Sequence, residues 1–131
     1  AHIDKDSMYN TPPVFSIYAS MLTLRWIKAN GGLEGMEKRN DAKQKLFYAE
    51  LDRNSMFHGH ATPDSRSWMN PTFRLNDESK APIFDKMWKE AGISGIAGHR
   101  SVGGYRASMY NALPLESVQV LVDVMKAFEA V

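Results

Sequence analysis

The sequence contains no cysteine, and this absence excludes two kinds of site from its 131 residues. No disulfide framework can form, and no thiolate can bind a metal ion. A reducing cytoplasm is compatible with this absence, which does not prove it, and a cytoplasmic protein is our expectation. Long apolar runs are also missing, because none approaches the ~20 residues that a membrane-spanning helix needs.

A strong excess of charge of either sign is missing too. Lysine and arginine together number 16, and aspartate and glutamate 15, which leaves a formal net charge of +1. This balance argues against a nucleic-acid or membrane-surface partner, because both need a strongly basic face. Hydrophobic residues at 44% and charged residues at 24% are typical of a globular protein, and the length fits one domain.

Common catalytic motifs are absent as well. There is no HExxH, P-loop, dinucleotide-binding glycine set or GxSxG elbow. No lysine lies in an apolar, glycine-flanked stretch that would lower its pKa for Schiff-base chemistry. His58 and His60 would share one side of a strand and could hold a metal, but no third ligand has suitable spacing. We therefore assign no catalytic residue and no metal site, and interpret both histidines as solvated.

Hydrophobic periodicity and turn residues predict an alternation of helices and strands. The expected helices cover residues 12–30, 33–54 and 79–91 and a last segment from 114, and the expected strands cover 56–61, 66–75, 93–100 and 105–110. This order predicts an α+β fold, in which helices pack on one face of a small, mainly antiparallel sheet.

The first expected helix, residues 12–30, is apolar almost all round. Such a helix is normally buried on several sides. Two interpretations remain open at this point: a central helix of the core, or a surface that packs against another domain or subunit.

A glycine-containing stretch near the end of the chain is the main candidate site. Residues 98–111 read GHRSVGGYRASMYN and place His99, Arg100 and Arg106 around the pair Gly103-Gly104. Glycine lets a backbone turn with positive φ, and a guanidinium offers a planar fork to carboxylate or phosphate oxygens. The stretch therefore predicts a site for a small, doubly charged anion. The alternative is a β-hairpin with solvated arginines.

A second candidate site lies at the start of the first expected helix. Asn10 and Thr11 precede Pro12 and Pro13, and helix starts are natural phosphate sites. The two prolines donate no N–H, so an anion there would depend on the side chains and N–H groups of Asn10 and Thr11. The alternative is that Thr11 only caps the helix.

Four stretches together resemble one family: YNTPP (residues 9–13), KANGG (28–32), SRSWMNPTFRL (65–75) and GHRSVGGYRASMYNALPLE (98–116). They resemble the C-terminal domain of phosphoserine aminotransferases, class V pyridoxal-phosphate enzymes of the aspartate-aminotransferase fold type. The likeness covers nearly the whole chain. It implies that residues 1–131 form the C-terminal domain, and that the large cofactor-binding domain with the imine-forming lysine would precede Ala1. The chain alone is then expected to be inactive.

The resemblance also implies roles for the candidate residues. His99 and Arg100 would hold the phosphate of phosphoserine or 3-phosphohydroxypyruvate, and Arg106 the α-carboxylate of phosphoserine and glutamate. Asn10 and Thr11 would contact the phosphate of pyridoxal 5'-phosphate in the neighbouring subunit of a homodimer. The complete enzyme would transfer an amino group from glutamate to 3-phosphohydroxypyruvate, giving phosphoserine and 2-oxoglutarate in serine biosynthesis. Two alternatives stay open: a related aminotransferase with another acidic acceptor, and a free-standing anion-binding or interaction domain.

Overall fold

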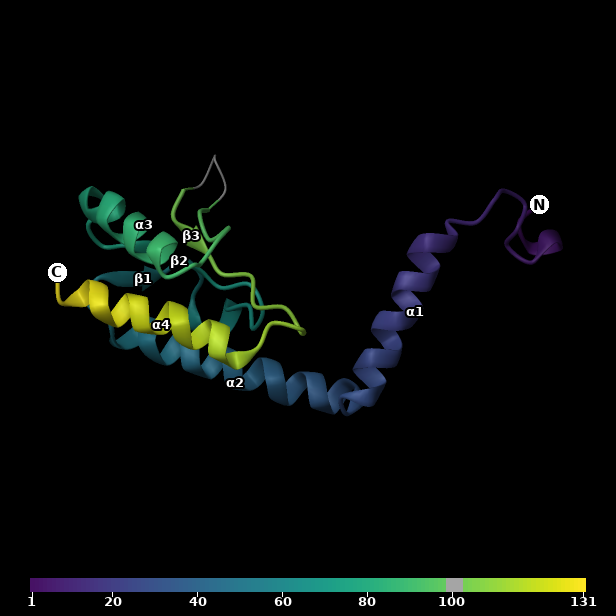
Figure 1. Cartoon of the computed structure of the whole chain (residues 1–131), viewed down its shortest axis with the longest axis horizontal. Coiled ribbons are helices and arrows are strands. Elements are labelled where there is room, and N and C mark those ends of the chain that lie inside the picture. The colour runs from purple at the N-terminus through teal and green to yellow at the C-terminus, as the bar shows by residue number, and fades with distance from the viewer. Residues whose placement is uncertain (99–102) are drawn as a thin grey trace. The chain divides into compact units, whose positions relative to one another are not determined.

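The computed structural model describes residues 1–98 and 103–131, which divide into two compact units, Ala1–Met36 and Glu37–Val131. The first unit contains α1 (Val14–Ala29) and the beginning of α2 (Gly32–Arg53), and α2 continues into the second unit (Figure 1). The second unit then adds β1 (Phe57–Gly59), β2 (Thr72–Leu75), α3 (Ala81–Glu90), β3 (Tyr105–Arg106) and α4 (Leu115–Glu129).

The three strands form one antiparallel sheet in the order β1-β2-β3. Phe57 pairs with Leu75, and Phe73 pairs with Tyr105. The predicted fold class, helices on a small antiparallel sheet, is confirmed. The strands are shorter than predicted: β2 begins at Thr72, directly after Pro71, because a proline has no N–H to give to the ladder.

An aromatic cluster forms the centre of the second unit. Each α-helix and strand that the structure describes there contributes one ring, and neighbouring ring centroids lie 5.0–5.8 Å apart. The six rings belong to Phe47 of α2, Phe57 of β1, Phe73 of β2, Phe84 of α3, Tyr105 of β3 and Phe128 of α4. The helices α2, α3 and α4 therefore share one core with the inner face of the sheet.

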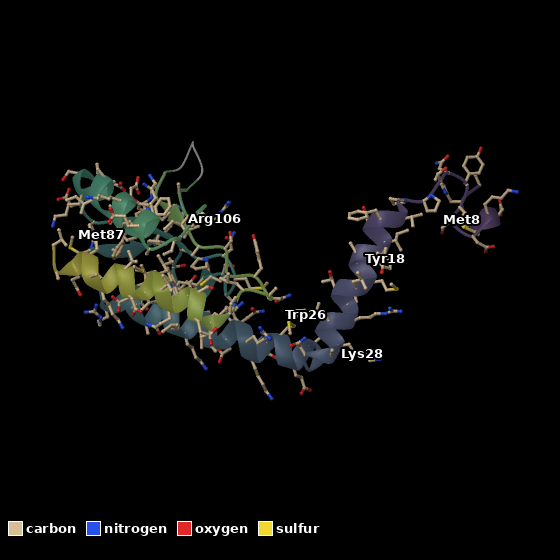
Figure 2. The ribbon with its side chains drawn as sticks, viewed as in Figure 1. Met8, Tyr18, Trp26, Lys28, Met87 and Arg106 are labelled. Atoms are coloured by element: carbon tan, nitrogen blue, oxygen red, sulfur yellow. The ribbon has the colours of Figure 1, made fainter. Side chains whose placement is uncertain are left out.

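Helix α1 has no buried residue, although its sequence is apolar. Phe15 is 83% exposed and Leu24 65%, and Figure 2 shows side chains such as Tyr18 standing out along the helix. Within the first unit nothing covers this apolar surface, so the helix needs a partner from outside that unit. No helix in the described part of the chain is both long and apolar enough to cross a bilayer.

The predicted hairpin of residues 93–100 and 105–110 is present in a reduced form. Ala97 forms a bridge with Tyr105, and the N–H of Arg106 donates to the carbonyl of Ile96 at 2.7 Å. The N–H of Gly98 donates to the carbonyl of Gly104 at 2.8 Å. Both Gly103 and Gly104 have positive φ, 71° and 66°, as the sequence predicts for a turn of this kind.

We expect Gly104→Ala to destabilise the protein more than its neighbour Gly103→Ala. Both variants force a side chain into positive φ, which costs roughly 1–2 kcal/mol. Of the two, only Gly104 would bring the new Cβ against other atoms of the described residues, with the carbonyl oxygen of Phe73 at 2.8 Å and Cγ of Arg74 at 2.9 Å. Denaturant unfolding of the two purified variants measures the difference. Equal midpoints would show that the close approach of Gly104 to β2 contributes nothing.

Candidate functional site

The outer face of the sheet carries the candidate site. Side chains alternate along a strand, so the residues next to the buried Phe57, Phe73 and Tyr105 point away from the core. Pairing places Arg106 opposite Thr72, and His58 opposite Arg74. The outward positions of the three strands thus hold two guanidiniums, an imidazole and a hydroxyl, and no carboxylate.

A small cavity of about 160 Å³ opens on this face. Its polar lining comes from His60, Thr72, Arg74 and Arg106, and Gly103 forms part of its wall. The structure thus brings the predicted Arg106 and Gly103 together with residues that the sequence did not assign to a site. The apolar-polar alternation of Thr72, Phe73 and Arg74 was the available signal, because it places residues 72 and 74 on one face.

The side chain of Arg106 is exposed and makes no ion pair with any residue of the described ranges (Figure 2). Other arginines of the second unit differ: Arg66 pairs with Asp52 at 2.5 Å, and Arg53 pairs with Glu50 at 2.7 Å. The guanidinium fork of Arg106 is therefore available to an anionic ligand, which the paired arginines are not.

The residue before Arg106 fixes its direction from the core side. Tyr105 is buried, and its hydroxyl donates to Oδ1 of Asp85 on α3 at 2.9 Å. The same carboxylate oxygen accepts from Nε1 of Trp88 at 3.0 Å. Burial, together with this bond to Asp85, raises the pKa of the Tyr105 phenol, so it remains a donor. Because Tyr105 is anchored inward, Arg106 must point outward.

The segment after Arg106 is held by β2 and α2. The N–H groups of Ala107 and Met109 donate to the carbonyls of Pro71 and Met69 at 3.0 and 2.8 Å. The ammonium of Lys43, on α2, donates to the carbonyls of Met109 and Tyr110 at 2.8 and 2.7 Å. These bonds fix the backbone within four residues of Arg106.

Lys43 also corrects a prediction, because no lysine was expected in a setting that lowers its pKa. Its side chain is only 1% exposed. Burial, and secondarily the charge of Arg39, lower the pKa of the Lys43 ammonium. Both carbonyl bonds use its Nζ, so the geometry makes Lys43 a positioning residue for the segment that follows Arg106.

The other predicted site residues lie elsewhere. His99 and Arg100 lie outside the described residues. Asn10 and Thr11 are exposed in the first unit, and α1 begins at Val14, two residues later than predicted. Pro13 precedes the helix and no side chain caps it, so the alternative in which Thr11 caps this helix is wrong.

The two histidines near β1 have different surroundings. Nδ1 of His58 lies 2.7 Å from Oδ1 of Asn76, whereas His60 lines the cavity beside Arg106. Within residues 1–98 and 103–131, no three potential metal ligands of the His, Cys, Asp or Glu types come together.

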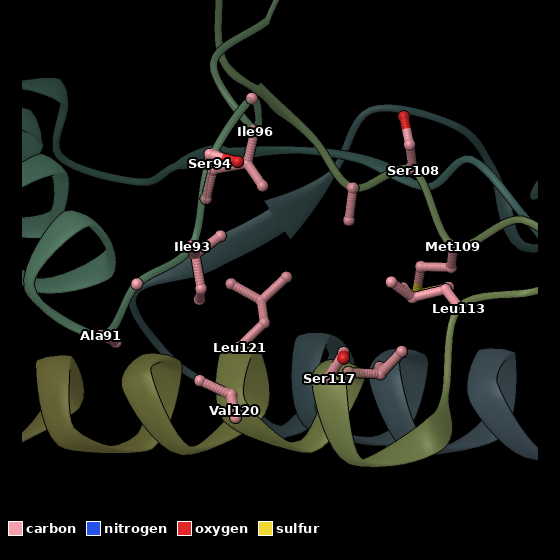
Figure 3. A pocket seen from close by; sticks show the side chains of 14 residues that line it. Ala91, Ile93, Ser94, Ile96, Ser108, Met109, Leu113, Ser117, Val120 and Leu121 are labelled. Carbon is pink, nitrogen blue, oxygen red and sulfur yellow. The ribbon is translucent and has the colours of Figure 1, made fainter.

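A second cavity, of about 330 Å³, lies between the start of α4 and the segments that flank β3 (Figure 3). Its lining is mainly apolar, with Ile93, Leu113 and Leu121 facing the space, and no charged side chain is among the described residues of this lining. None of the predicted site residues that the structure describes lines it. An anion therefore has its complementary charges at the cavity beside Arg106 and not here.

Comparison with known proteins shows the family of the chain. A family model described as Aminotransferase class-V matches residues 2–121. The chain therefore belongs to the class-V aminotransferase family.

Relatives within that family carry a more specific name. The chain is 65% identical over 128 residues to a phosphoserine aminotransferase of Flavobacterium psychrophilum and 57% identical over 131 residues to one of Phocaeicola vulgatus. These alignments cover 98% of this chain but only 36% and 37% of the relatives.

Solved structures agree with these sequence matches. A phosphoserine aminotransferase from Bacillus circulans subsp. alkalophilus superposes with a TM-score of 0.92 at 45% identity, and covers 98% of this chain and 36% of its own. A pyridoxal-phosphate-bound phosphoserine aminotransferase from Trichomonas vaginalis superposes with a TM-score of 0.86 at 37% identity. The match covers 95% of this chain and 36% of the Trichomonas chain. These matches favour neither of the two alternative functions.

We expect Lys43→Met to loosen the segment that follows Arg106. Two carbonyls lose their donor, which costs about 1–3 kcal/mol and speeds local amide exchange roughly ten- to hundredfold. Hydrogen exchange at the amides of Ala107 and Met109 measures this change. Lys45→Met, which removes an exposed cation from the same helix, is the control and should leave both amides protected. Unchanged exchange in Lys43→Met would contradict the positioning role.

The free energy of unfolding should differ between the wild type and Lys43→Met by an amount that depends on pH. Because burial lowers the pKa of Lys43, the unfolded chain keeps this proton at pH values where the folded chain has released it. The wild type therefore gains stability over Lys43→Met as the pH rises from the lowered pKa to the ordinary lysine value of 10.5. Unfolding of both proteins across the alkaline range measures the gain. A difference that shrinks with rising pH would contradict it.

Proposed function

We propose that this chain is the C-terminal, substrate-recognition domain of a phosphoserine aminotransferase. The complete enzyme exchanges an amino group between glutamate and 3-phosphohydroxypyruvate, giving phosphoserine and 2-oxoglutarate in serine biosynthesis. The observation that carries the proposal is the unpaired guanidinium of Arg106 on the outer face of the sheet, in a chain 65% identical to a relative of that name.

Arg106 binds the α-carboxylate that phosphoserine and glutamate share. A carboxylate accepts two parallel hydrogen bonds from a guanidinium fork, which holds it in one orientation. The anchoring of Tyr105 to Asp85 and the fixed backbone beyond Arg106 limit the motion of this fork. Such a clamp places the substrate so that its amino-bearing carbon reaches the reacting centre in a constant position.

His99 and Arg100 bind the phosphate of the phosphorylated substrates. They directly precede the segment that leads through Gly103-Gly104 to Arg106, so one short stretch of sequence supplies donors for both ends of the substrate. A dianionic phosphate needs donors from more than one direction, and an imidazole together with a guanidinium supplies them.

Pyridoxal 5'-phosphate supplies the electron sink for the transfer when it is bound. No lysine is among the described residues that line the cavity beside Arg106, and the buried Lys43 donates to two carbonyls. We assign the covalent anchor of the cofactor to the part of the enzyme that this chain, at 36% of a relative's length, does not cover. Asn10 and Thr11 fit the phosphate of the cofactor, because both side chains are exposed and offer an amide N–H and a hydroxyl.

The complete enzyme works as a homodimer in the cytoplasm, and α1 lies at the subunit contact. A helix with exposed Phe15, Ile17 and Leu24 has an apolar surface that a partner normally covers. Asn10 and Thr11 precede this helix, so they enter the active site of the other subunit.

Substitutions in the complete enzyme separate the roles of the anion-binding residues. Arg106→Ala should lower kcat/KM for phosphoserine and for glutamate alike. His99→Ala and Arg100→Ala should lower kcat/KM selectively for phosphorylated substrates. Loss of a charged hydrogen bond costs about 1.5–3 kcal/mol, or roughly one to two decades in kcat/KM. Steady-state kinetics with each amino donor measures both effects. An unchanged glutamate reaction in Arg106→Ala would refute the assigned division of roles.

Complementation between subunits tests Asn10 and Thr11. The double variant Asn10→Ala and Thr11→Ala should bind pyridoxal phosphate more weakly and keep its fold, as cofactor titration and circular dichroism would show. This variant is then co-expressed with a subunit that lacks the cofactor-binding lysine. In a mixed dimer one active site carries both lesions and the other carries neither, so activity should return. Dimers that form but stay inactive would place both residues in their own subunit's site or outside it.

A further inference from the structure

Arg74 lies on the outer face of the sheet with Arg106, two residues along β2 from the residue that pairs with Arg106. Thr72 lies opposite Arg106, and Arg74 therefore lies opposite Gly104. Diagonal neighbours in an antiparallel pair are roughly 7–8 Å apart at their Cα atoms, within reach of long side chains. Arg74 is thus displaced from Arg106 toward the glycine pair, and both side chains line the same cavity of about 160 Å³.

The position of Arg74 depends on the glycine opposite it. A Cβ at residue 104 would lie 2.9 Å from Cγ of Arg74 and 3.7 Å from its Nε, so the arginine stem occupies the space that any other residue would fill. Arg74 is half-buried in this place. The aliphatic part of the Arg74 side chain therefore has little conformational freedom before a ligand binds. A contact between its guanidinium and a ligand then costs less conformational entropy.

The charges on the described residues that line this cavity have one sign. Arg74 and Arg106 contribute two permanent positive charges, and His60 and the Thr72 hydroxyl add further polar groups. No aspartate or glutamate lines the cavity. Two guanidiniums that line one small cavity complement a ligand of high negative charge.

From this placement we infer that Arg74 is a further specificity-determining residue, which contacts the phosphate end of the substrate while Arg106 holds its α-carboxylate. This inference rests on the proposed function. Phosphoserine has its phosphate a few bonds from its carboxylate, and two guanidiniums on neighbouring ladder positions can meet both groups. A phosphate carries about 1.5 to 2 negative charges against one for the distal carboxylate of glutamate, so Arg74 favours the phosphorylated substrate.

The test compares Arg74→Gln, Arg74→Lys and Lys86→Gln in the complete enzyme. Lys86 is a cation of α3 with 74% of its side chain exposed, outside the cavity lining, and serves as the matched loss of charge. Arg74→Gln should raise the KM for phosphoserine about tenfold and that for glutamate about threefold or less. Arg74→Lys keeps the charge and the stem but loses the fork, so its effect on phosphoserine should be smaller. Lys86→Gln should change neither KM by more than about twofold.

Arg106→Gln, measured in the same series, separates this inference from the proposed function. If Arg106→Gln leaves both donors unaffected, the proposed function itself fails. If Arg106→Gln weakens both donors but Arg74→Gln spares phosphoserine, or weakens both donors equally, the role of Arg74 is refuted. If Arg74→Gln does not fold, Arg74→Lys tests the role of Arg74 instead. A KM for phosphoserine and a donor preference equal to those of the wild type overturn the role. A rise in the KM for phosphoserine alone supports it.

Discussion

Six aromatic rings, one from each α-helix and strand of residues 37–131, pack together with centroids 5.0–5.8 Å apart, and the candidate site depends on this contact. Phe57, Phe73 and Tyr105 bring the inner face of all three strands to the cluster, and Phe84 and Phe128 bring α3 and α4. Aromatic pairs of this kind contribute about 0.5–1.5 kcal/mol each beyond the burial of their surface. The cluster therefore joins elements that are far apart in the sequence.

The cluster also determines which side chains face the candidate site. A strand that directs one ring to the core must direct its next side chain to the opposite face. Because Phe73 and Tyr105 face the core, Arg74 and Arg106 both lie on the outer face of the sheet. The core thus positions the candidate site, and Phe73 and Tyr105 also line its cavity. Two hydrogen bonds add to the packing of the rings. Asp85 accepts from the Tyr105 hydroxyl, and a donor from α2 bonds to the backbone after Arg106.

Much of this architecture is predictable from the sequence, and the exceptions have physical reasons. Alternation around Phe73 and periodicity in α4 correspond to the observed sheet and helix, and Arg106 was identified from its glycine neighbours. Lys43 was missed because a lysine in a helix is normally exposed. Only its spacing from Met36 and Phe47, which places it on the buried side of α2, marks it as a core position. The surroundings of α1 cannot follow from its own residues, because an apolar helix shows that it needs a partner but not which one.

The brevity of β3 has an evolutionary consequence. Tyr105 and Arg106 are its only two residues, and hydrogen bonds from Arg106 to Ile96 and from Ala107 to Pro71 fix their register. Insertion or deletion of a single codon at this point would exchange the two faces, turning the phenol to solvent and the guanidinium into the aromatic cluster. An unpaired charge there is far more costly than any loss of packing. Natural variants can therefore differ here in residue type, while changes of length have to fall outside the pairing of β3 with its neighbours.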